Sequence, residues 1–518
     1  MMRNTNSGRC TQRSNELHCQ QPDDDFPATT PGSVHRNEVT IHMMIEHHQH
    51  FIGGKLVESH SAGRIEVIDP ATEQVIGTIA DGDARDIAAA VGAAEAAAPA
   101  WAAKSAAERA TVLRAIADAF EARMDEISAL VPRQNGTPIS IARAMQSQVP
   151  VVYRYFADLA DVFEPEELVE TASGDAIVRR EPVGVVGAII PWNGPQPLTA
   201  WKLGPALAAG CTVVIKPAQE TSLDAFLFAE ILTEADVPDG VVNIVTGGRE
   251  TGAALVADQG VRKIAFTGST RAGRAIAAEC AAQLKRVTLE LGGKSAGILL
   301  DDVDLDEFRP LVLSACSPNT GQTCRALTRV LVPSSRHDEI VEMLEETLRS
   351  IPQGDPSDPV NLFGPLVNAL QRERVESYIA LGRAEGATVV LGGGRPEGLE
   401  RGYYVEPTIF TDVTNDMRIA REEIFGPVLV VMSYETVDEA VAIANDSEYG
   451  LGGGVFSSDR EKATEVARRI VSGSVGINTS TLPIETPFGG VKNSGMGREL
   501  GPQALDAYLE YKTLFRAK

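Results

Sequence analysis

Short runs of β-branched and other apolar residues alternate with helical patterns over most of the chain. Such runs in the middle of the chain are VGVVGAII (183–190), TVVIK (212–216), VNIVT (242–246), KIAFTG (263–268) and VTLELGG (287–293). Strands that alternate with helices are typical of a parallel sheet covered on both faces. The alternation resumes with TRVLVP (328–333), PVLVVMSY (427–434) and GSVGIN (473–478), so the sequence predicts an α/β protein with two α/β domains.

The region before these runs has patterns of its own. FIGGKLVES (51–59) predicts a short hairpin where order begins, and the alanine-rich stretch that follows predicts a helical region interrupted at Pro99. Ser105 and Glu108 form a capping-box signature ahead of apolar positions between 112 and 127. The spacing of these positions predicts one amphipathic helix.

The start of the chain differs in composition, being rich in Asn, Gln, Ser, Thr, His and Asp without a sustained apolar period. We therefore expect residues 1–49 to be a disordered extension. His47, His48 and His50 could bind a metal ion, but their polar surroundings favour a mobile tail. Only His337 lies beyond residue 60, so we expect no histidine-centred triad and no metal site in the main body.

Charge and cysteine content exclude several classes of protein. The chain has 518 residues with 71 acidic and 47 basic side chains, a formal charge of −24 that has the wrong sign for binding nucleic acid or an anionic membrane. Its apolar run at 183–190 is far shorter than the roughly 20 residues of a spanning helix. Six cysteines without a secretory stretch at the start favour reduced thiols, so we expect a cytoplasmic protein.

Polar or glycine-rich residues follow each of the five central runs. They are residues 191–193, 216–220, 246–248, 267–270 and 291–294. Because ligands bind at the carboxyl ends of strands in a doubly wound sheet, these residues together predict a nucleotide crevice. Gly268 and Ser269 would open a helix whose N-terminal amides face a pyrophosphate. The G-x-G-x-x-G motif is missing after the first strand, so an ordinary dinucleotide-binding assignment on that motif fails.

Seven longer motifs occur along the chain. They are IIPWN (189–193), AWKLGPALAAGCTVVIKPA (200–218), FTGST (266–270), LELGGKS (289–295), GQTC (321–324), EEIFGPV (422–428) and PFGGVKNSGMGRELG (487–501). Through them the sequence resembles the aldehyde dehydrogenase superfamily. The resemblance implies a Rossmann-like NAD(P)-binding domain (residues 50–163 and 183–292), an α/β catalytic domain (residues 293–494) and a small β oligomerisation arm (residues 164–182 and 495–518).

Aldehyde oxidation by hydride transfer requires a tetrahedral adduct, and a thiolate is the best side-chain nucleophile to form it. The polar approach at 319–323 favours Cys324, and the family's nucleophile falls on this residue. Water must then be activated to hydrolyse a thioester, and without histidines the base has to be a carboxylate. Glu290 matches the family's general base. Asn193, with the backbone amide of Cys324, matches its oxyanion donors.

The resemblance also implies the cofactor contacts. They are Ile190, Pro191, Trp192, Lys216, Gln219, Gly248, Gly268, Ser269, Glu423 and Phe425. Gln219 departs from the family, which often has a glutamate there. A carboxylate at this position grips the ribose hydroxyls and repels a 2′-phosphate, so we expect NAD, while NADP stays admissible.

The substrate is expected to be a small-molecule aldehyde, in a pocket lined by Gly194, Trp201, Thr323, Arg325 and Phe488. Gly194 stands where the family commonly has a large aromatic residue, which widens the pocket for bulkier aldehydes unless neighbours refill it. Arg325 could pair with an acidic substrate, although a salt-bridged or solvent-facing arginine is more common.

The sequence thus predicts an NAD(P)-dependent, non-acylating aldehyde dehydrogenase that converts an aldehyde and water into a carboxylic acid. A CoA-acylating dehydrogenase is the alternative among enzymes, and Glu290 disfavours it. A catalytically inactive nucleotide-binding structural protein is the alternative from another class, and the intact chemical set disfavours it. Segments 166–180 and 509–515 have β-forming character, and by resemblance they form an arm that makes a homodimer or homotetramer.

Overall fold

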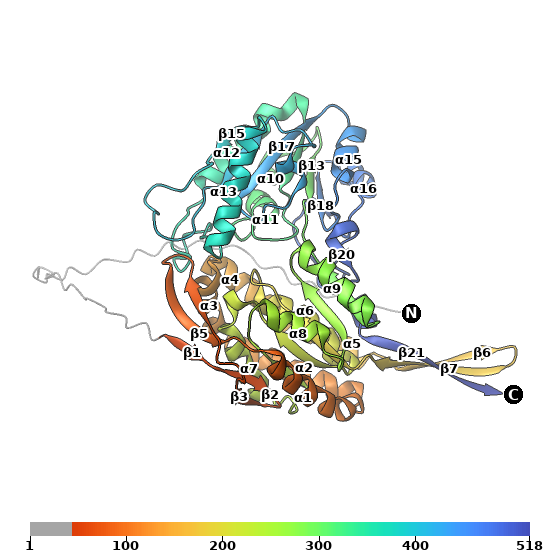
Figure 1. Ribbon diagram of the computed structural model, residues 1–518. Helices are drawn as coiled ribbons and strands as arrows, with labels where there is room; N and C mark the ends of the chain where they lie inside the picture. Colours follow the sequence, from red (N-terminus) through yellow and green to blue (C-terminus); the bar gives the residue numbers. More distant parts are fainter. Residues whose placement is uncertain (1–43, 518) are drawn as a thin grey trace, which may run out of the picture. The chain divides into compact units, whose positions relative to one another are not determined.

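The computed structural model describes residues 44–517 (Figure 1). Its eight-stranded sheet has the order β20-β12-β11-β8-β9-β10-β2-β3. The parallel strands are β8 (Val185–Ile189), β9 (Thr212–Lys216), β10 (Val242–Ile244), β11 (Val261–Thr267) and β12 (Arg286–Glu290). They coincide with the five apolar runs, which confirms the predicted parallel sheet.

Antiparallel strands close both edges of this sheet. β2 (Gln49–Ile52) and β3 (Lys55–Glu58) form the predicted hairpin, with Gly53 and Gly54 both at positive φ in its two-residue turn. At the other edge β20 (Gly495–Met496) pairs with β12. The expected arm begins at residue 495, but these two residues belong to the sheet instead.

The chain changes its direction of travel across the sheet at β8. It passes from β8 to β9 and β10 on one side, and then returns to β11 and β12 on the other. At such a switch point the loops after neighbouring strands diverge and leave room for a ligand. The loops that leave β8 and β11 begin at Ile190 and Gly268, which are both predicted cofactor residues.

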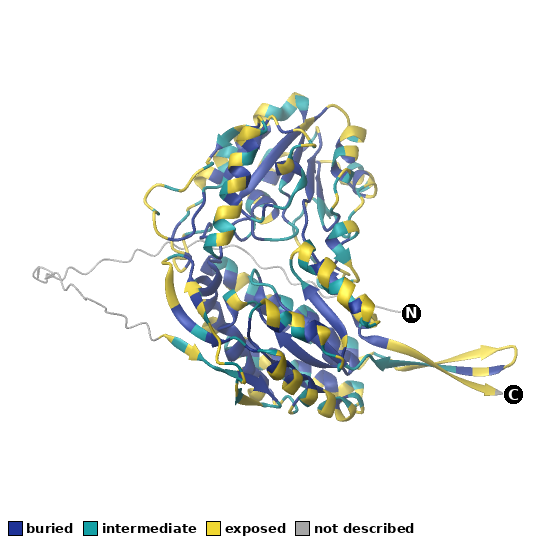
Figure 2. Ribbon diagram, in the orientation of Figure 1, coloured by how far each residue is buried: buried dark blue, intermediate teal, exposed yellow. Residues whose placement is uncertain are grey.

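Helices pack on both faces of this sheet. One face carries α1 (Ala84–Ala102), α8 (Arg249–Ala257) and α9 (Thr270–Ala282). On the other face α6 (Pro195–Ala209) and α7 (Asp224–Glu234) contact the sheet. Packed against these two helices are α2 (Ala106–Ala122), α3 (Met124–Asn135), α4 (Ile139–Gln146) and α5 (Gln148–Asp161). Both apolar layers are dark blue in Figure 2, and the outer helix surfaces are yellow.

Two helix predictions are wrong, although the capping box at Ser105 is confirmed. α1 continues through Pro99, because a proline near the end of a helix removes only one backbone hydrogen bond and the buried Trp101 anchors the last turn. The single amphipathic helix predicted after Ser105 is split into α2 and α3. Arg123 separates them with φ −110° and ψ 11°, and its guanidinium pairs with carboxylates of α3 and α7.

The second large sheet has seven strands in the order β15-β16-β17-β14-β13-β18-β19. Its strands are β13 (Ala296–Leu299), β14 (Arg329–Pro333), β15 (Thr388–Leu391), β16 (Thr408–Thr411), β17 (Val428–Tyr434), β18 (Gly453–Phe456) and β19 (Gly476–Ile477). The accompanying helices are α10 (Leu305–Phe308), α11 (Val312–Cys316), α12 (His337–Ser350), α13 (Ala369–Ala384), α14 (Arg418–Arg421), α15 (Val437–Asn445) and α16 (Arg460–Ala467). This sheet has apolar clusters of its own, as the prediction of a second α/β domain requires.

A three-stranded sheet corrects the predicted start of the ordered chain. β1 (Ile45–His47) pairs with β5 (Gln74–Ala80), which pairs with β4 (Arg64–Asp69). The predicted disordered extension therefore ends too late, since regular structure begins at Ile45; residues 1–43 lie outside the described part. His47 stacks on Phe226 at 3.8 Å between ring centroids, whereas His48 Nε2 lies 3.1 Å from Thr78 Oγ1.

The histidines are thus part of the fold and face different partners. His50, on β2, is fully buried. Within residues 44–517 no three His, Cys, Asp or Glu side chains are grouped so as to hold a metal ion.

The last three-stranded sheet joins two distant segments, with β7 (Gly174–Pro182) between β6 (Glu166–Thr171) and β21 (Leu509–Ala517). It lies at the lower right of Figure 1 and is largely yellow in Figure 2. All of β6 is exposed, and Phe515 on β21 is 86% exposed. α17 (Gln503–Asp506) precedes β21 and contacts α6. No helix in the described part of the chain has the length and apolar character needed to cross a membrane.

Candidate active site

The predicted nucleophile lies on a loop between α11 and β14 whose backbone is constrained. Asn319, Thr320 and Gly321 follow one another with φ of 50°, 56° and 73°, all in the left-handed region. A Cβ at Gly321 would lie 2.0 Å from the carbonyl oxygen of Gly426, so only glycine fits there. Strain of this kind persists only where the surrounding structure holds it, and it is concentrated at functional sites.

Side-chain hydrogen bonds hold the loop. Thr320 Oγ1 accepts from the backbone amide of Gly364 at 3.0 Å, and Gln322 Oε1 accepts from that of Val367 at 3.0 Å. These bonds attach the loop to the segment before α13. The following residue, Thr323, donates from its hydroxyl to the carbonyl of Pro318 at 3.2 Å.

Cys324 is the one cysteine in the described part of the chain that is partly exposed; Cys211, Cys280 and Cys316 are buried. Its deep position raises the pKa of the Cys324 thiol to about 12, and the charges of Glu423 and Glu290 act in the same direction. The thiol is therefore protonated at neutral pH, and a nucleophilic role requires that its proton be removed.

Asn193 lies beside this loop. Its Nδ2 donates to the carbonyl of Gln322 at 3.0 Å, and its own carbonyl accepts from Asn319 Nδ2 at 3.4 Å. The structure thus brings the Asn193 loop, at the end of β8, into contact with the residues that precede Cys324, as an oxyanion site made by both would require.

Glu290 is the last residue of β12 and is only 3% exposed. Neither of its carboxylate oxygens has a hydrogen-bond partner among residues 44–517. Burial raises its pKa well above the usual value, and the charge of Glu499 raises it further. Gly489 leaves the space for this carboxylate, because a Cβ there would lie 2.6 Å from Glu290 Oε1. An unpartnered carboxylate with a raised pKa is suited to accept a proton.

A buried ion pair next to Glu290 was not anticipated by sequence reasoning. Lys202 Nζ lies 2.8 Å from Glu499 Oε1 and donates to Thr267 Oγ1 at 2.6 Å; both charged residues are buried. The available signal was a lysine within the apolar stretch 200–218 and a glutamate within the motif 487–501. Their pairing could not be inferred, because almost 300 residues separate them in the sequence.

The predicted adenosine-side residues meet at the ends of β9 and β10. Lys216 Nζ donates to the carbonyl of Gly247 at 2.9 Å, and burial lowers the pKa of Lys216 to about 8. The amide of Gly248 donates to Asp81 Oδ1 at 2.9 Å. Gln219 is exposed, and its Oε1 lies 3.4 Å from the position of a Cβ at Gly248. The structure therefore places these predicted residues together.

The predicted pyrophosphate residues begin α9. Ser269 is exposed and is the N-cap of this helix, where its hydroxyl accepts from the amide of Ala272 at 3.3 Å. The amide of Gly268 donates to the carbonyl of Glu290 at 3.0 Å. A helix N-terminus at the carboxyl end of β11 is the geometry that favours a bound phosphate group.

The predicted nicotinamide-side residues come from both large sheets. Trp192, after β8, packs edge-on against Phe425 at 5.3 Å between ring centroids. Phe425 has a φ of 65°. Glu423 Oε1 accepts from the amide of Gly293 at 2.9 Å, and burial raises the pKa of Glu423 to about 7. Ile190 and Pro191 directly precede Trp192, and Ile190 is buried.

The expected widening at Gly194 is limited by its neighbours. A Cβ at Gly194 would lie 3.1 Å from Met145 Cε and 3.6 Å from Leu198 Cδ1, so these flexible side chains occupy part of the space. Trp201 and Phe488 pack edge-to-face at 5.2 Å between ring centroids.

Arg325 is half-buried and is neither salt-bridged nor fully solvent-facing in the described part of the chain. Its Nη1 donates to the carbonyl of Ser480 at 2.5 Å, and it forms no ion pair among residues 44–517. Cys324, Leu198 and Trp201 belong to one apolar cluster, to which Leu482 and Ile484 also contribute.

Comparison with known proteins places this geometry in a wider context. A model of the aldehyde dehydrogenase family matches residues 56–514. The geranial dehydrogenase of Castellaniella defragrans is 48% identical over 478 residues, which cover 91% of this chain and 99% of that protein. An aldehyde dehydrogenase of Mycobacterium tuberculosis in complex with NAD+ superposes with a TM-score of 0.89 at 44% identity, covering 91% of this chain and 98% of its own. Aldehyde dehydrogenase C of Pseudomonas syringae, in complex with NAD+ and octanal, superposes with a TM-score of 0.88 at 42% identity, covering 90% and 96%.

Proposed function

The chain belongs to the aldehyde dehydrogenase family, and we propose that Cys324, Glu290 and Asn193 carry out its oxidation of an aldehyde to a carboxylic acid. The observation that carries this assignment is the buried carboxylate of Glu290. It has no hydrogen-bond partner in the described chain, and its negative charge raises the pKa of the Cys324 thiol. Burying a carboxylate without a hydrogen-bond partner costs folding free energy, and such groups are concentrated at catalytic sites.

Cys324 attacks the carbonyl carbon to form a thiohemiacetal. The thiol is protonated in the resting site, so its proton passes to solvent as the adduct forms. Hydride departure then leaves a thioester on Cys324, and Glu290 accepts a proton from the water that hydrolyses it. Glu290 then gives this proton to the departing sulfur of Cys324, so each turnover restores the thiol and releases the acid.

Asn193 and the backbone amide of Cys324 donate to the oxyanion that forms at each tetrahedral stage. The hydrogen bond from Asn193 Nδ2 to the carbonyl of Gln322 keeps this side chain beside the loop that carries Cys324. Removing one donor of this type typically raises the activation free energy by about 2.7 to 4 kcal/mol.

The residues at the switch point fit a dinucleotide, since a buried lysine, a helix N-terminus and an aromatic pair lie at neighbouring strand ends. NAD+ bound there would supply the hydride acceptor. Lys216, Gln219 and Gly248 would hold the adenosine end, Gly268 and Ser269 would line the pyrophosphate, and Glu423 and Phe425 would hold the nicotinamide end. The negative charges of Glu220 and Asp81 act on Lys216. They would repel a 2′-phosphate bound beside this lysine, which supports NAD over NADP.

The substrate proposed for this site is an uncharged aldehyde with an apolar tail. Cys324 shares an apolar cluster with Leu198, Trp201, Leu482 and Ile484, and Nη1 of Arg325 is bonded to a backbone carbonyl. The similarity to a geranial dehydrogenase and to an octanal-bound structure supports the same class.

The sheet of β6, β7 and β21 supports a homodimer or homotetramer. An exposed strand edge with exposed apolar residues such as Phe515 favours pairing with a second copy. We assign the protein to the cytoplasm, in keeping with the free thiols of its described cysteines.

Steady-state NADH formation with octanal, geranial and a charged aldehyde, with and without coenzyme A, tests the proposal. We expect turnover with the apolar aldehydes, no need for coenzyme A, and no turnover for Cys324→Ala. Full turnover of Cys324→Ala would defeat the assignment. Turnover that depends on coenzyme A would support the acylating alternative instead.

A further inference from the structure

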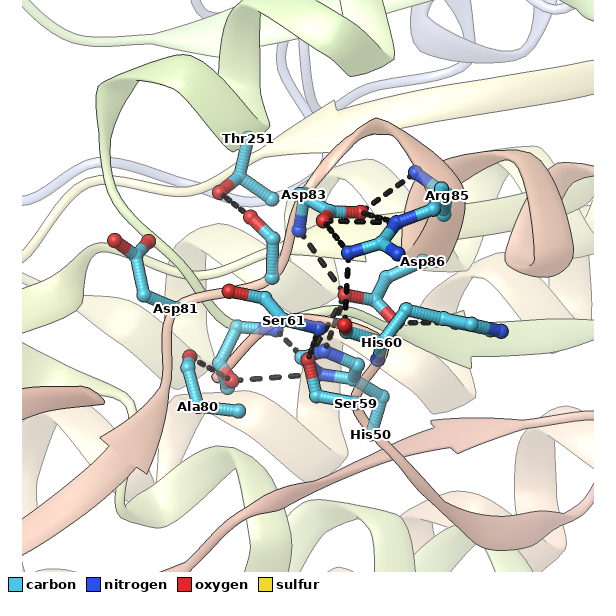
Figure 3. Close-up of polar contacts among 12 residues, drawn as sticks. His50, Ser59, His60, Ser61, Ala80, Asp81, Asp83, Arg85, Asp86 and Thr251 are labelled. Atoms are coloured by element: carbon cyan, nitrogen blue, oxygen red, sulfur yellow. Dashed lines mark hydrogen bonds and ion pairs between the residues drawn. The ribbon is translucent and has the colours of Figure 1, made fainter. Parts of the chain in front are cut away.

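A polar cluster around Asp86 lies close to segment 246–248 and takes no part in the mechanism above (Figure 3). Its centre is Asp86, in the first turn of α1, which is 1% exposed. Asp86 Oδ2 accepts from Ser59 Oγ at 2.9 Å and from the amide of Asp83 at 3.0 Å. Asp86 Oδ1 accepts from the amide of His60 at 2.8 Å. These bonds favour the carboxylate and hold the pKa of Asp86 below its usual value.

His50 lies between this carboxylate and the loop that follows β10. Its Nε2 is 3.4 Å from Asp86 Oδ2, and its Nδ1 accepts from the backbone amide of Thr246 at 3.3 Å. A backbone amide can only donate, so Nδ1 is the acceptor of this bond, and it also lies 3.4 Å from Thr246 Oγ1. With Nδ1 as acceptor, the ring proton of neutral His50 lies on Nε2, on the side of Asp86.

Thr246 begins the segment 246–248, whose other contacts reach the cofactor residues. The carbonyl of Gly247 accepts from Lys216 Nζ, and the amide of Gly248 donates to Asp81 Oδ1, at 2.9 Å in both cases. The segment is also attached to residues 80–82. Thr246 Oγ1 donates to the carbonyl of Ala80 at 2.9 Å, and the amide of Gly82 donates to the carbonyl of Thr246 at 3.1 Å.

We propose that His50 is a positioning residue for cofactor binding: its neutral ring holds segment 246–248, and through it Lys216 and Gly248, in the geometry that receives the adenosine end of the cofactor. This inference rests on the cofactor role proposed above for Lys216 and Gly248. Gly82 supports it, because a Cβ there would lie 2.9 Å from His50 Nε2, so the ring is packed closely against the residue whose amide bonds the carbonyl of Thr246.

Protonation of His50 would break the contact. A proton on Nδ1 would point at the N–H of Thr246, and the segment would lose its acceptor. The groups that act on His50 are Asp86 of α1, His60 of the loop after β3, and Arg64 of β4. Burial outweighs the attraction of Asp86 and lowers the pKa of His50, so the ring is neutral at pH 7 and becomes charged only in acid.

Two substitutions separate the positioning role from simple packing. His50→Leu removes the acceptor and leaves a buried amide unsatisfied, so the KM for NAD+ should rise about fivefold or more, with the KM for the aldehyde and kcat at saturating NAD+ unchanged. His50→Asn supplies a side-chain oxygen that can accept from Thr246 and does not titrate. It should keep a KM for NAD+ close to that of the wild type. His48→Leu is the matched control, because its ring contacts Thr78 of β5 instead.

The pH profile of the KM for NAD+ is the second readout. In the wild type this KM should rise only as the pH falls below the usual pKa of histidine, because burial lowers the pKa of His50, and in His50→Asn the rise should be absent. If His50→Leu does not fold, this comparison decides. An unchanged KM for NAD+ in folded His50→Leu, an equal rise in His48→Leu, or identical pH profiles of the wild type and His50→Asn would overturn the inference. A wild-type protein that reduces no NAD+ would instead refute the proposed function.

Discussion

Replacing Glu290 with glutamine should stop hydrolysis while it stabilises the fold. Glutamine has nearly the same shape, and because neither oxygen of Glu290 has a hydrogen-bond partner in the described chain, the substitution breaks no observed bond. It removes the general base, which is typically worth about 10² to 10⁴ in rate. It also removes a negative charge that raises the pKa of the Cys324 thiol, so formation of the thioester should continue.

The effect on stability follows from the raised pKa of Glu290. The folded protein holds this proton more tightly than the unfolded chain does, so the wild type loses stability as the pH rises from the usual value for glutamate through the raised pKa. The free energy of unfolding falls in total by about 1.4 kcal/mol for each unit by which folding raises this pKa. Above that range Glu290→Gln should unfold at a higher temperature than the wild type, and near pH 4 the two should converge.

Stopped-flow absorbance at the NADH band and thermal unfolding at several pH values measure the two effects. We expect a burst close to one NADH per active site, followed by a steady rate lower by about 10² to 10⁴. Glu465→Gln, at an exposed position of α16, is the matched control and should change neither property. A steady rate equal to that of the wild type would remove Glu290 from its role, and a lower stability at neutral pH would contradict the electrostatic reasoning.

Three further substitutions test other parts of the site. Gly489→Ala would place its Cβ 2.6 Å from Glu290 Oε1, so steady-state turnover should fall while the burst persists in rapid kinetics. Gly194→Phe must displace Met145 from the adjoining space, so the kcat/KM for geranial should fall more than that for acetaldehyde in a side-by-side assay. Lys216→Met should raise the KM for NAD+ about tenfold and leave the KM for the aldehyde unchanged, since it removes the proposed ribose contact and the bond to Gly247, both on the cofactor side. Equal changes in both constants would count against the ribose contact.

Periodicity and local signals predicted the frame of the fold well. The five central runs became adjacent parallel strands, because continuous β-branched runs are suited to strands buried on both faces. Their polar ends therefore met at one edge of the sheet, which is why Lys216, Gly248 and Gly268 could be grouped from sequence. The capping box at Ser105 depends only on residues three positions apart, so it too could be predicted.

The features that sequence reasoning missed depend on contacts between distant residues. The Lys202–Glu499 ion pair and the His50–Asp86 contact join segments that only the tertiary fold brings together. α1 continues past Pro99 because Trp101 is buried, and burial of a particular residue is not readable from a proline signal. Met145, on α4, occupies part of the space beside Gly194. The absence of an aromatic side chain at residue 194 therefore overstated, by itself, the width of the expected pocket.

The most direct test of the mechanism is the mass of the Glu290→Gln protein after mixing with NAD+ and octanal. The account predicts an added octanoyl group on the peptide that contains Cys324, in an amount equal to the NADH formed in the burst. An NADH burst without this adduct, or with the acyl group on another cysteine, would contradict it.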